Sequence, residues 1–206
     1  MAKKQIKKSY HHGHLRDALI NAALKLIEKK GVKGLTLREI AKHAKVSHSA
    51  PYRHFKDKAD LLTAVAVEGF ETLVKETHKR FETVSGDPLS RFRESGLAYI
   101  DFAIAHPSHF RVMFGLGENR QQTPPALKKA SGESFRILLD SIMACQEKTY
   151  IKAGDPMELA LCAWSIVHGF ATLYIEGYIK KYDYEGNQRL KEMITDNLYL
   201  GLHIKP

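Results

Sequence analysis

Side chains that could bind an anionic polymer are concentrated between residues 48 and 58. His48, Ser49, Tyr52 and Arg53 place imidazole, hydroxyl, phenol and guanidinium groups close together along the chain. Groups of these kinds donate hydrogen bonds to phosphate oxygens and to the edges of bases. Presented on one side of a helix, they predict a surface that binds a nucleic acid.

Two short helical patterns joined by a tight turn are the elements that would position these groups. In residues 37–44, apolar side chains recur at i, i+3, i+4 and i+7, and Thr36 and Glu39 have the spacing of a capping box. A turn at Lys45 leads into a second pattern, residues 48–55. The arrangement predicts a helix-turn-helix whose second helix fits the major groove of DNA.

The positive charge of the chain is confined to its N-terminal part. Residues 1–60 contain 15 Lys and Arg against 5 Asp and Glu, whereas the other 146 residues contain 17 against 18. The net charge of +9 therefore comes entirely from the part that carries the helix-turn-helix pattern. Such a segment attracts phosphates through counterion release, and the simpler alternative is a solvated basic face.

The stretch VSHSAPYRHFKDKADLL, with LTLREIAKHA before it, resembles the DNA-binding domain of TetR/AcrR-type transcriptional regulators. The resemblance covers about residues 10–65, and its core is the spacing YxHFxxK at 52–58. The residues that it implies to hold the DNA backbone or nearby base edges are Arg38, Tyr52, His54 and Lys58. Those that it implies to read the DNA sequence are His48, Ser49, Ala50 and Arg53.

Pro51 departs from the pattern of this family, which more commonly has Leu, Ile or Phe at the position. A proline lacks the backbone N–H and restricts the residue before it, here Ala50. In a helix capped by Ser47, the missing N–H would be the first that bonds inside the helix. We therefore expect the helix to begin near Ala50 or Pro51, with Phe55 as an inward anchor.

A further helix, which braces the other two, is predicted from residue 15 to Lys30, with Gly31 as its C-terminal cap. Residues 1–14 contain four lysines and no acidic residue, which indicates a flexible basic arm that reaches a phosphate backbone or a minor groove. A metal site is the alternative for its three histidines. We favour the arm and expect no metal, because an imidazole site needs further ligands and fixed geometry. The histidines are His11, His12 and His14.

The fold class predicted for the whole chain is all-α, since almost no strand pattern occurs. Residues 15–60 are expected to form a three-helix DNA-binding domain, and residues 61–206 a helical bundle for effector binding and dimerisation. Turns that combine Asp or Thr with Pro separate the helices of the bundle. With the three helices before residue 58 this gives nine, the later six being near 58–82, 88–105, 107–115, 125–150, 155–180 and 187–203.

Residues 157–175 are apolar on nearly every side. Their length would just allow a membrane span, but Glu158 and His168 and the absence of other such segments favour a buried core or interface helix. We therefore treat the protein as cytoplasmic. Cys145 and Cys162 fit a reducing compartment, and a redox switch between them is the alternative.

Trp164, His168 and Gly169 resemble the Trp-His-Gly (WHG) signature of one C-terminal domain type among TetR-like regulators, and HPSHFRVMFG at 106–115 is similar to a segment of the same group. Trp164 and His168 share a helix face, where they either line an effector pocket or simply pack. Further candidate wall residues, with the same alternative of core packing, are Phe110, Met113, Phe114 and Phe135.

The resemblance implies a homodimeric repressor that a small-molecule effector releases from a palindromic DNA operator. The last two helices suit dimerisation, and Ala163, Gly169 and Ala171 are small enough for close helix approach. Two recognition helices on one side of a duplex must match major grooves about 34–36 Å apart or a multiple of that. The palindrome follows from this symmetry.

Catalytic motifs are missing from the sequence: it has no GxSxG, no phosphate-cradling glycine loop, no HExxH and no paired CxxC. We therefore expect no enzymatic activity and no cofactor. The alternative function is a helical small-molecule-binding protein or enzyme that makes only nonspecific contact with nucleic acid.

Overall fold

The computed structural model describes residues 12–84, 86–115, 123–182 and 187–202, and the regular elements within them are all helices. The all-α fold is confirmed. The chain divides into two compact units, residues 1–65 and 66–206.

The first unit contains α1 (His12–Lys30), α2 (Leu37–His43), the short 3-10 helix η1 (Pro51–Arg53) and the start of α3 (Lys58–Phe81). Helix α1 packs against α2. The buried side chains in the core of this unit are apolar and include Leu19, Ala23, Ile27, Ile40, Phe55 and Leu61. Because α1 begins at His12, residues 12–14 of the predicted arm are helical, and residues 1–11 lie outside the described residues.

Helix α2 begins and ends as its sequence predicts. Thr36 is the N-cap, and its Oγ1 accepts a hydrogen bond from the backbone N–H of Glu39 at 3.2 Å. At the other end Lys45 has a left-handed conformation, with φ of 58°. The N–H of Val46 then bonds the carbonyl of Ala41 at 3.0 Å, which closes the turn of the helix-turn-helix as a Schellman motif.

The α-helix predicted for residues 48–55 is not observed. Residues 48–50 form a turn, and the segment continues as the single 3-10 turn of η1 instead of an α-helix. The N–H groups of His54 and Phe55 both bond the carbonyl of Pro51 at 2.9 Å. The predicted start near Ala50 or Pro51 is confirmed, since Pro51 lacks the N–H that an earlier α-helix requires. Pro51 and Phe55 are both buried, and Phe55 is the inward anchor.

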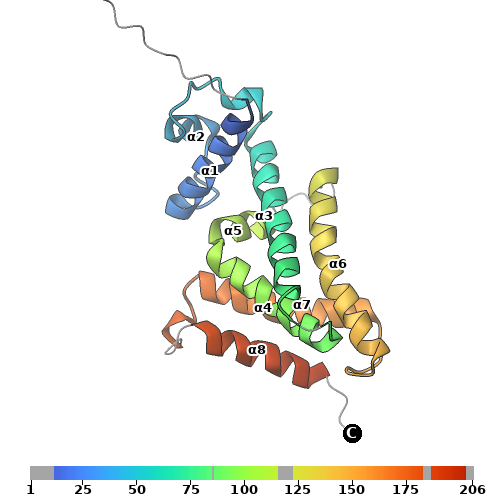
Figure 1. Ribbon diagram of the computed structural model, residues 1–206. Helices are drawn as coiled ribbons and strands as arrows, with labels where there is room; N and C mark the ends of the chain where they lie inside the picture. The colour runs from blue at the N-terminus through green and yellow to red at the C-terminus, as the bar shows by residue number, and fades with distance from the viewer. Residues whose placement is uncertain (1–11, 85, 116–122, 183–186, 203–206) are drawn as a thin grey trace, which may run out of the picture. The chain divides into compact units, whose positions relative to one another are not determined.

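The second unit is a helical bundle around α4 (Pro88–Ala105). In Figure 1, α4 lies among α5 (Pro107–Gly115), α6 (Pro125–Glu147), α7 (Pro156–Ile175) and α8 (Asn187–Leu202), and it contacts all four. A short 3-10 helix, η3 (Lys180–Tyr182), follows α7. The largest fully buried side chains of this unit include Phe102, Ile100, Leu97 and Ile142.

Helix starts in this unit follow the predicted Asp–Pro pattern. Asp87 accepts a hydrogen bond from the N–H of Ser90 at 2.9 Å, and Asp155 accepts one from the N–H of Met157 at 2.8 Å. Two helices end earlier than predicted, α6 at residue 147 and α7 at residue 175. The cause is a left-handed residue after each helix, Thr149 with φ of 54° and Gly177 with φ of 86°.

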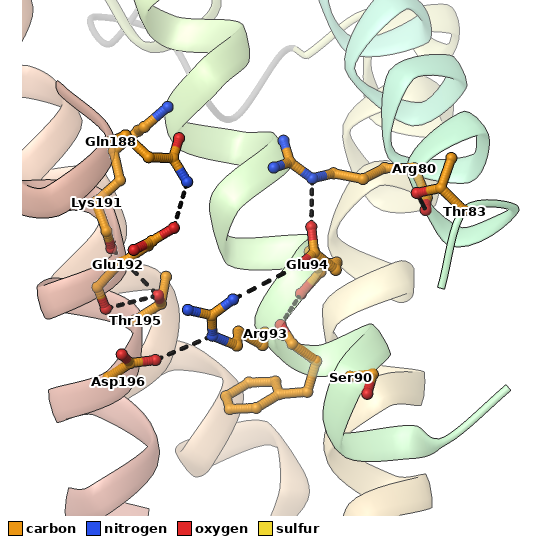
Figure 2. Close-up of polar contacts among 12 residues, drawn as sticks. Arg80, Thr83, Ser90, Arg93, Glu94, Gln188, Lys191, Glu192, Thr195 and Asp196 are labelled. Atoms are coloured by element: carbon orange, nitrogen blue, oxygen red, sulfur yellow. Dashed lines mark hydrogen bonds and ion pairs between the residues drawn. The ribbon is translucent and has the colours of Figure 1, made fainter. Parts of the chain in front are cut away.

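Charged side chains connect α3, α4 and α8 within the second unit. Figure 2 shows Arg80 of α3 directed at Glu94 of α4, and Arg93 between Glu94 and Asp196 of α8. Arg80 also pairs with Asp101, which in turn pairs with Lys191, whose side chain is 6% exposed. Burial alone would lower the pKa of Arg80, but its bonds to Asp101 and Glu94 raise that pKa. These bonds therefore keep the Arg80 guanidinium charged.

Candidate nucleic-acid interface and aromatic cluster

Five of the predicted DNA-contacting side chains are exposed on the helix-turn-helix. They are Arg38, His48, Ser49, Tyr52 and Arg53. Tyr52 is 63% exposed, which is unusual for a large aromatic side chain next to two buried ones, Pro51 and Phe55. The buried residues fix the backbone of η1, and the exposed ones project from it. Hydroxyl, imidazole and guanidinium groups are therefore exposed to a partner, although the Ser49 hydroxyl also bonds that of Ser47 at 3.2 Å.

Ala50 differs from these five residues because it is buried. Its side chain is 8% exposed, and its backbone N–H bonds the carbonyl of Ser47 at 3.0 Å. Its methyl group therefore offers little surface to a base, and the predicted reading role of Ala50 stays a prediction.

His54 and Lys58 are half-buried. The Nε2 atom of His54 is buried and has no hydrogen-bond partner among the described residues. The ammonium of Lys58 donates to the backbone carbonyl of Lys33 at 3.2 Å. Lys58 opens α3, and the carboxylate of Asp57 accepts from the N–H of Asp60 at 2.9 Å. These bonds orient Lys58 at a helix N-terminus, where anions are favoured.

In the second unit, five of the six predicted pocket residues meet in one cluster of rings. Phe110 stacks on His168 with centroids 5.3 Å apart, and Phe114 meets the edge of the same imidazole at 4.6 Å. Trp164 lies 5.4 Å from His168 and 6.2 Å from Phe135. Helices α5, α6 and α7 supply these side chains. Phe110 is buried, whereas the other four are half-buried.

Tyr99 of α4 lies at the centre of this cluster, and sequence reasoning did not identify it. The indole N–H of Trp164 donates to Tyr99 Oη at 3.1 Å, and Oη is 2.7 Å from His168 Nδ1. Its flanking apolar residues indicate a core tyrosine, so only the fold could show that its hydroxyl faces Trp164 and His168. Burial raises the pKa of Tyr99 above its usual range and lowers the pKa of His168.

Met113 is the sixth predicted pocket residue, and the structure places it against α3 instead. A Cβ atom added at Gly69 of α3 would lie 2.6 Å from Met113 Sδ and 3.3 Å from His109 Cβ. Gly69 therefore permits α3 and α5 to approach closely, and Met113 fills that contact. Its role in the described structure is helix packing.

Helix α7 carries an exposed apolar face. Its exposed large side chains are Met157, Leu161, Ile166 and Leu173, and α8 adds Met193 and Leu200. Gly169 opens into free space, whereas Ala163 and Ala171 are buried inside the unit. Of the three small residues predicted at a dimer contact, only Gly169 is therefore available there. By length and composition α7 could also cross a membrane, a property that it shares with the core helices of soluble proteins.

The remaining candidate groups are histidines and cysteines. No cluster of three or more His, Cys, Asp or Glu side chains suited to a metal occurs in the described residues, and His11 lies outside them. Cys145 is buried and Cys162 is exposed, and both thiols are free. Burial, with the nearby charge of Asp87, raises the pKa of the Cys145 thiol to about 11.

Comparison with family models covers both units. Residues 92–197 match tetracyclin repressor-like C-terminal domains, and residues 19–65 match bacterial regulatory proteins of the tetR family. The description of the C-terminal match does not mention the Trp-His-Gly signature, so that finer resemblance stays a prediction.

Curated relatives share parts of the chain. The HTH-type transcriptional regulator AcrR of Shigella flexneri is 40% identical over 80 residues, which cover 38% of this chain and 37% of the relative. Tetracycline repressor protein class C of Escherichia coli is 32% identical over 142 residues, 66% of this chain and 58% of the relative. The chain spans 37 to 60% of the length of the first curated relatives that it matches.

Solved structures match over nearly the full length. A protein with unknown function from Rhodococcus sp. RHA1 is 32% identical, with a TM-score of 0.82 over 96% of this chain and 100% of that one. The fatty acid degradation regulator FadR of Bacillus halodurans has a TM-score of 0.77 over 98% of this chain and 100% of its own. Its identity is 18%, so it supports the fold alone.

Proposed function

This chain belongs to the TetR family of bacterial regulatory proteins, and on that premise we propose that it is a sequence-specific DNA-binding repressor. It binds a palindromic operator and leaves this DNA when a small molecule binds to the protein. The observation that carries the proposal is the exposed face of the helix-turn-helix. Its polar and basic side chains project from a short element that buried Pro51 and Phe55 hold in place.

Within this interface the side chains divide by chemistry. Arg38 of α2 and Lys58 at the start of α3 present cations suited to phosphates. His48, Ser49 and Arg53 lie on the turn and on η1, where their donors suit base edges. His54, which is half-buried beside Tyr52 and Arg53, is assigned to the DNA backbone as well.

A homodimer is the second part of the proposal. The exposed apolar side chains of α7 and α8 form a face that water disfavours, and a symmetric pairing of two such faces would cover them. The gap at Gly169 allows a second helix to approach closely. A dimer of this kind would present two helix-turn-helix elements to the two halves of a palindrome. A cytoplasmic location follows from this role.

An effector site is needed for release of the repressor from its operator. We assign the effector to the ring cluster around Tyr99, which four helices build and which keeps several rings half-buried. An effector that prefers one conformation of the bundle shifts the population towards it and weakens operator binding by the same free energy. In this role the chain is a regulator rather than an enzyme.

The proposal is tested by selecting bound duplexes from a random DNA library with the purified protein, and by measuring their affinity at two salt concentrations. We expect one palindrome to be enriched and to bind well above random DNA at both. Lys58→Ala should reduce the salt dependence by about one phosphate contact, and Tyr52→Phe should weaken binding without unfolding the protein.

Lys148→Ala is the matched control, because Lys148 is exposed at the end of α6 in the other unit. It should leave affinity and salt dependence unchanged. Salt-sensitive binding without any enriched sequence, by a folded protein, would contradict the proposal and favour a small-molecule-binding protein or enzyme with nonspecific nucleic-acid contact.

A further inference from the structure

The hydrogen bonds inside the ring cluster fix the position of one proton. The indole N–H of Trp164 can only donate, so Tyr99 Oη accepts its bond. The hydroxyl proton of Tyr99 is buried, and its remaining partner is His168 Nδ1, 2.7 Å away. A buried donor without a partner is costly, so this proton is donated to Nδ1. The ring proton of His168 therefore resides on Nε2.

That Nε2–H group is an available donor on an imidazole that other rings contact. Among the described residues His168 has one hydrogen bond, from Tyr99, and its imidazole contacts the rings of Tyr99, Phe110, Phe114 and Trp164. In the described part of the chain, no ion pair joins this imidazole to an acidic side chain, and its partners there are Tyr99 and aromatic rings. Burial lowers the pKa of His168, which keeps the ring neutral near pH 7.

A second polar group without a partner lies one turn further along α7. Thr172 Oγ1 is buried and has no hydrogen-bond partner among the described residues. Residues four positions apart share a helix face, so His168 and Thr172 are neighbours on α7. The Nε2–H donor of His168 and the unpartnered Thr172 Oγ1, beside a set of half-buried rings, point to a bound molecule that supplies an acceptor.

We propose that this cluster binds an uncharged, mainly aromatic molecule with one acceptor oxygen, such as an ester or a ketone, and that His168 Nε2–H donates to that oxygen. The assignment rests on the proposed function, because it gives the chemical class of the effector. A carboxylate would lose its water without meeting a cation, and an ammonium group would meet a donor where it needs an acceptor. A hydrocarbon would leave the donor unpaired.

Trp164 makes the test direct, since it is the only tryptophan of the chain. Its fluorescence is followed while the full chain, without DNA, is titrated with four probes of similar size: methyl phenylacetate, phenylacetate, phenethylamine and propylbenzene. We expect the ester to bind best, with about a tenfold preference over propylbenzene, which corresponds to one hydrogen bond.

Two variants test the donor itself. His168→Leu should abolish the preference for the ester over propylbenzene, while His168→Gln, which retains an N–H donor, should keep part of it. The decisive quantity is the ratio of the two affinities, so a general loss of packing does not imitate the result. If His168→Leu does not fold, the ranking of the four probes by the wild-type protein decides alone.

The proposal is overturned if phenylacetate or phenethylamine binds best, if none of the four probes changes the fluorescence, or if the ester preference is the same in His168→Leu. The library selection is run on the same preparation, so the two proposals fail separately. An enriched palindrome without an ester preference rejects the ligand class and leaves the repressor. An ester preference without an enriched sequence rejects the repressor and leaves the binding site.

Discussion

Arg38 and Arg53 carry the same charge on different parts of the helix-turn-helix, so their removal should have different effects. Arg38 lies on α2 and suits a phosphate, whereas Arg53 lies on η1 and suits a guanine edge. We expect Arg38→Ala to weaken all duplexes alike and to lower the salt slope by about one. Arg53→Ala should cost about 1–3 kcal/mol on the selected operator and relax one of its positions.

The measurement is a repeat of the library selection with each variant. An unchanged selected sequence for Arg53→Ala, or an altered one for Arg38→Ala, would reverse the assignment of the two arginines.

Tyr99 gives a second prediction for a single residue. Tyr99→Phe removes the acceptor of the Trp164 N–H and the donor to His168 Nδ1, which leaves two half-buried polar groups unpaired. We expect the free energy of unfolding of the second unit to fall by about 1–3 kcal/mol. Urea unfolding followed by Trp164 fluorescence measures it.

Tyr182→Phe is the control, because Tyr182 is 53% exposed and its hydroxyl can bond water instead. Equal stability of the two variants would mean that the hydroxyl of Tyr99 contributes nothing to the cluster.

The sequence predicts which residues are polar and where they occur, but not which side of the backbone faces the core. Ala50 illustrates the limit, since its neighbours His48 and Ser49 are exposed while it is buried. Tyr99 illustrates the opposite case, because a buried tyrosine is identified as functional only when its partners are known. Those partners are 65 and 69 positions away in the chain.

At the scale of the elements, left-handed residues decide where helices end. Thr149 has φ of 54°, a conformation that costs an L-residue roughly 1–2 kcal/mol and is unfavourable for a β-branched one. We expect Thr149→Gly to stabilise the second unit by about 1 kcal/mol and to raise its Tm.

Lys148→Gly is the matched substitution, because its φ of −90° requires no glycine. It should not stabilise the unit, and a rise in Tm equal to that of Thr149→Gly would refute the role of the left-handed turn.

Helix positions were largely predictable because their signals are local. The Asp–Pro starts of α4 and α7 and the Schellman turn after α2 depend on residues within one or two turns. The 3-10 form of η1 was less predictable from the sequence. It depends both on the missing N–H of Pro51, which shortens the helix, and on the packing of the buried Phe55. Long-range packing also explains Met113, which sequence spacing could not distinguish from its pocket-lining neighbours.

For the molecule as a whole, two half-buried histidines contribute to the dependence of stability on pH. Burial lowers the folded-state pKa of both His109 and His168 below 6.5. The unfolded chain therefore binds more protons, and stability is complete above the unfolded pKa and is lost as the pH falls through the folded one. We expect the free energy of unfolding to decrease from about pH 7 to about pH 5.

Urea titrations at several pH values check this, and His168→Gln should reduce the slope. The lowered carboxyl pKa values of Glu39 and Asp87 act only at more acidic pH, because their unperturbed values are 4.5 and 3.8. Constant stability over the upper range would show that both imidazoles titrate normally.

The two cysteines differ in exposure, so the rate of thiol labelling can report whether two copies of the chain associate. Cys162 lies exposed on the apolar face of α7, whereas Cys145 is buried with a raised pKa and so supplies little thiolate. A maleimide reagent should therefore modify one site, at a rate set by how often that face is uncovered. Labelling that slows as the protein is concentrated would report subunit pairing from kinetics alone, with no substitution in the chain.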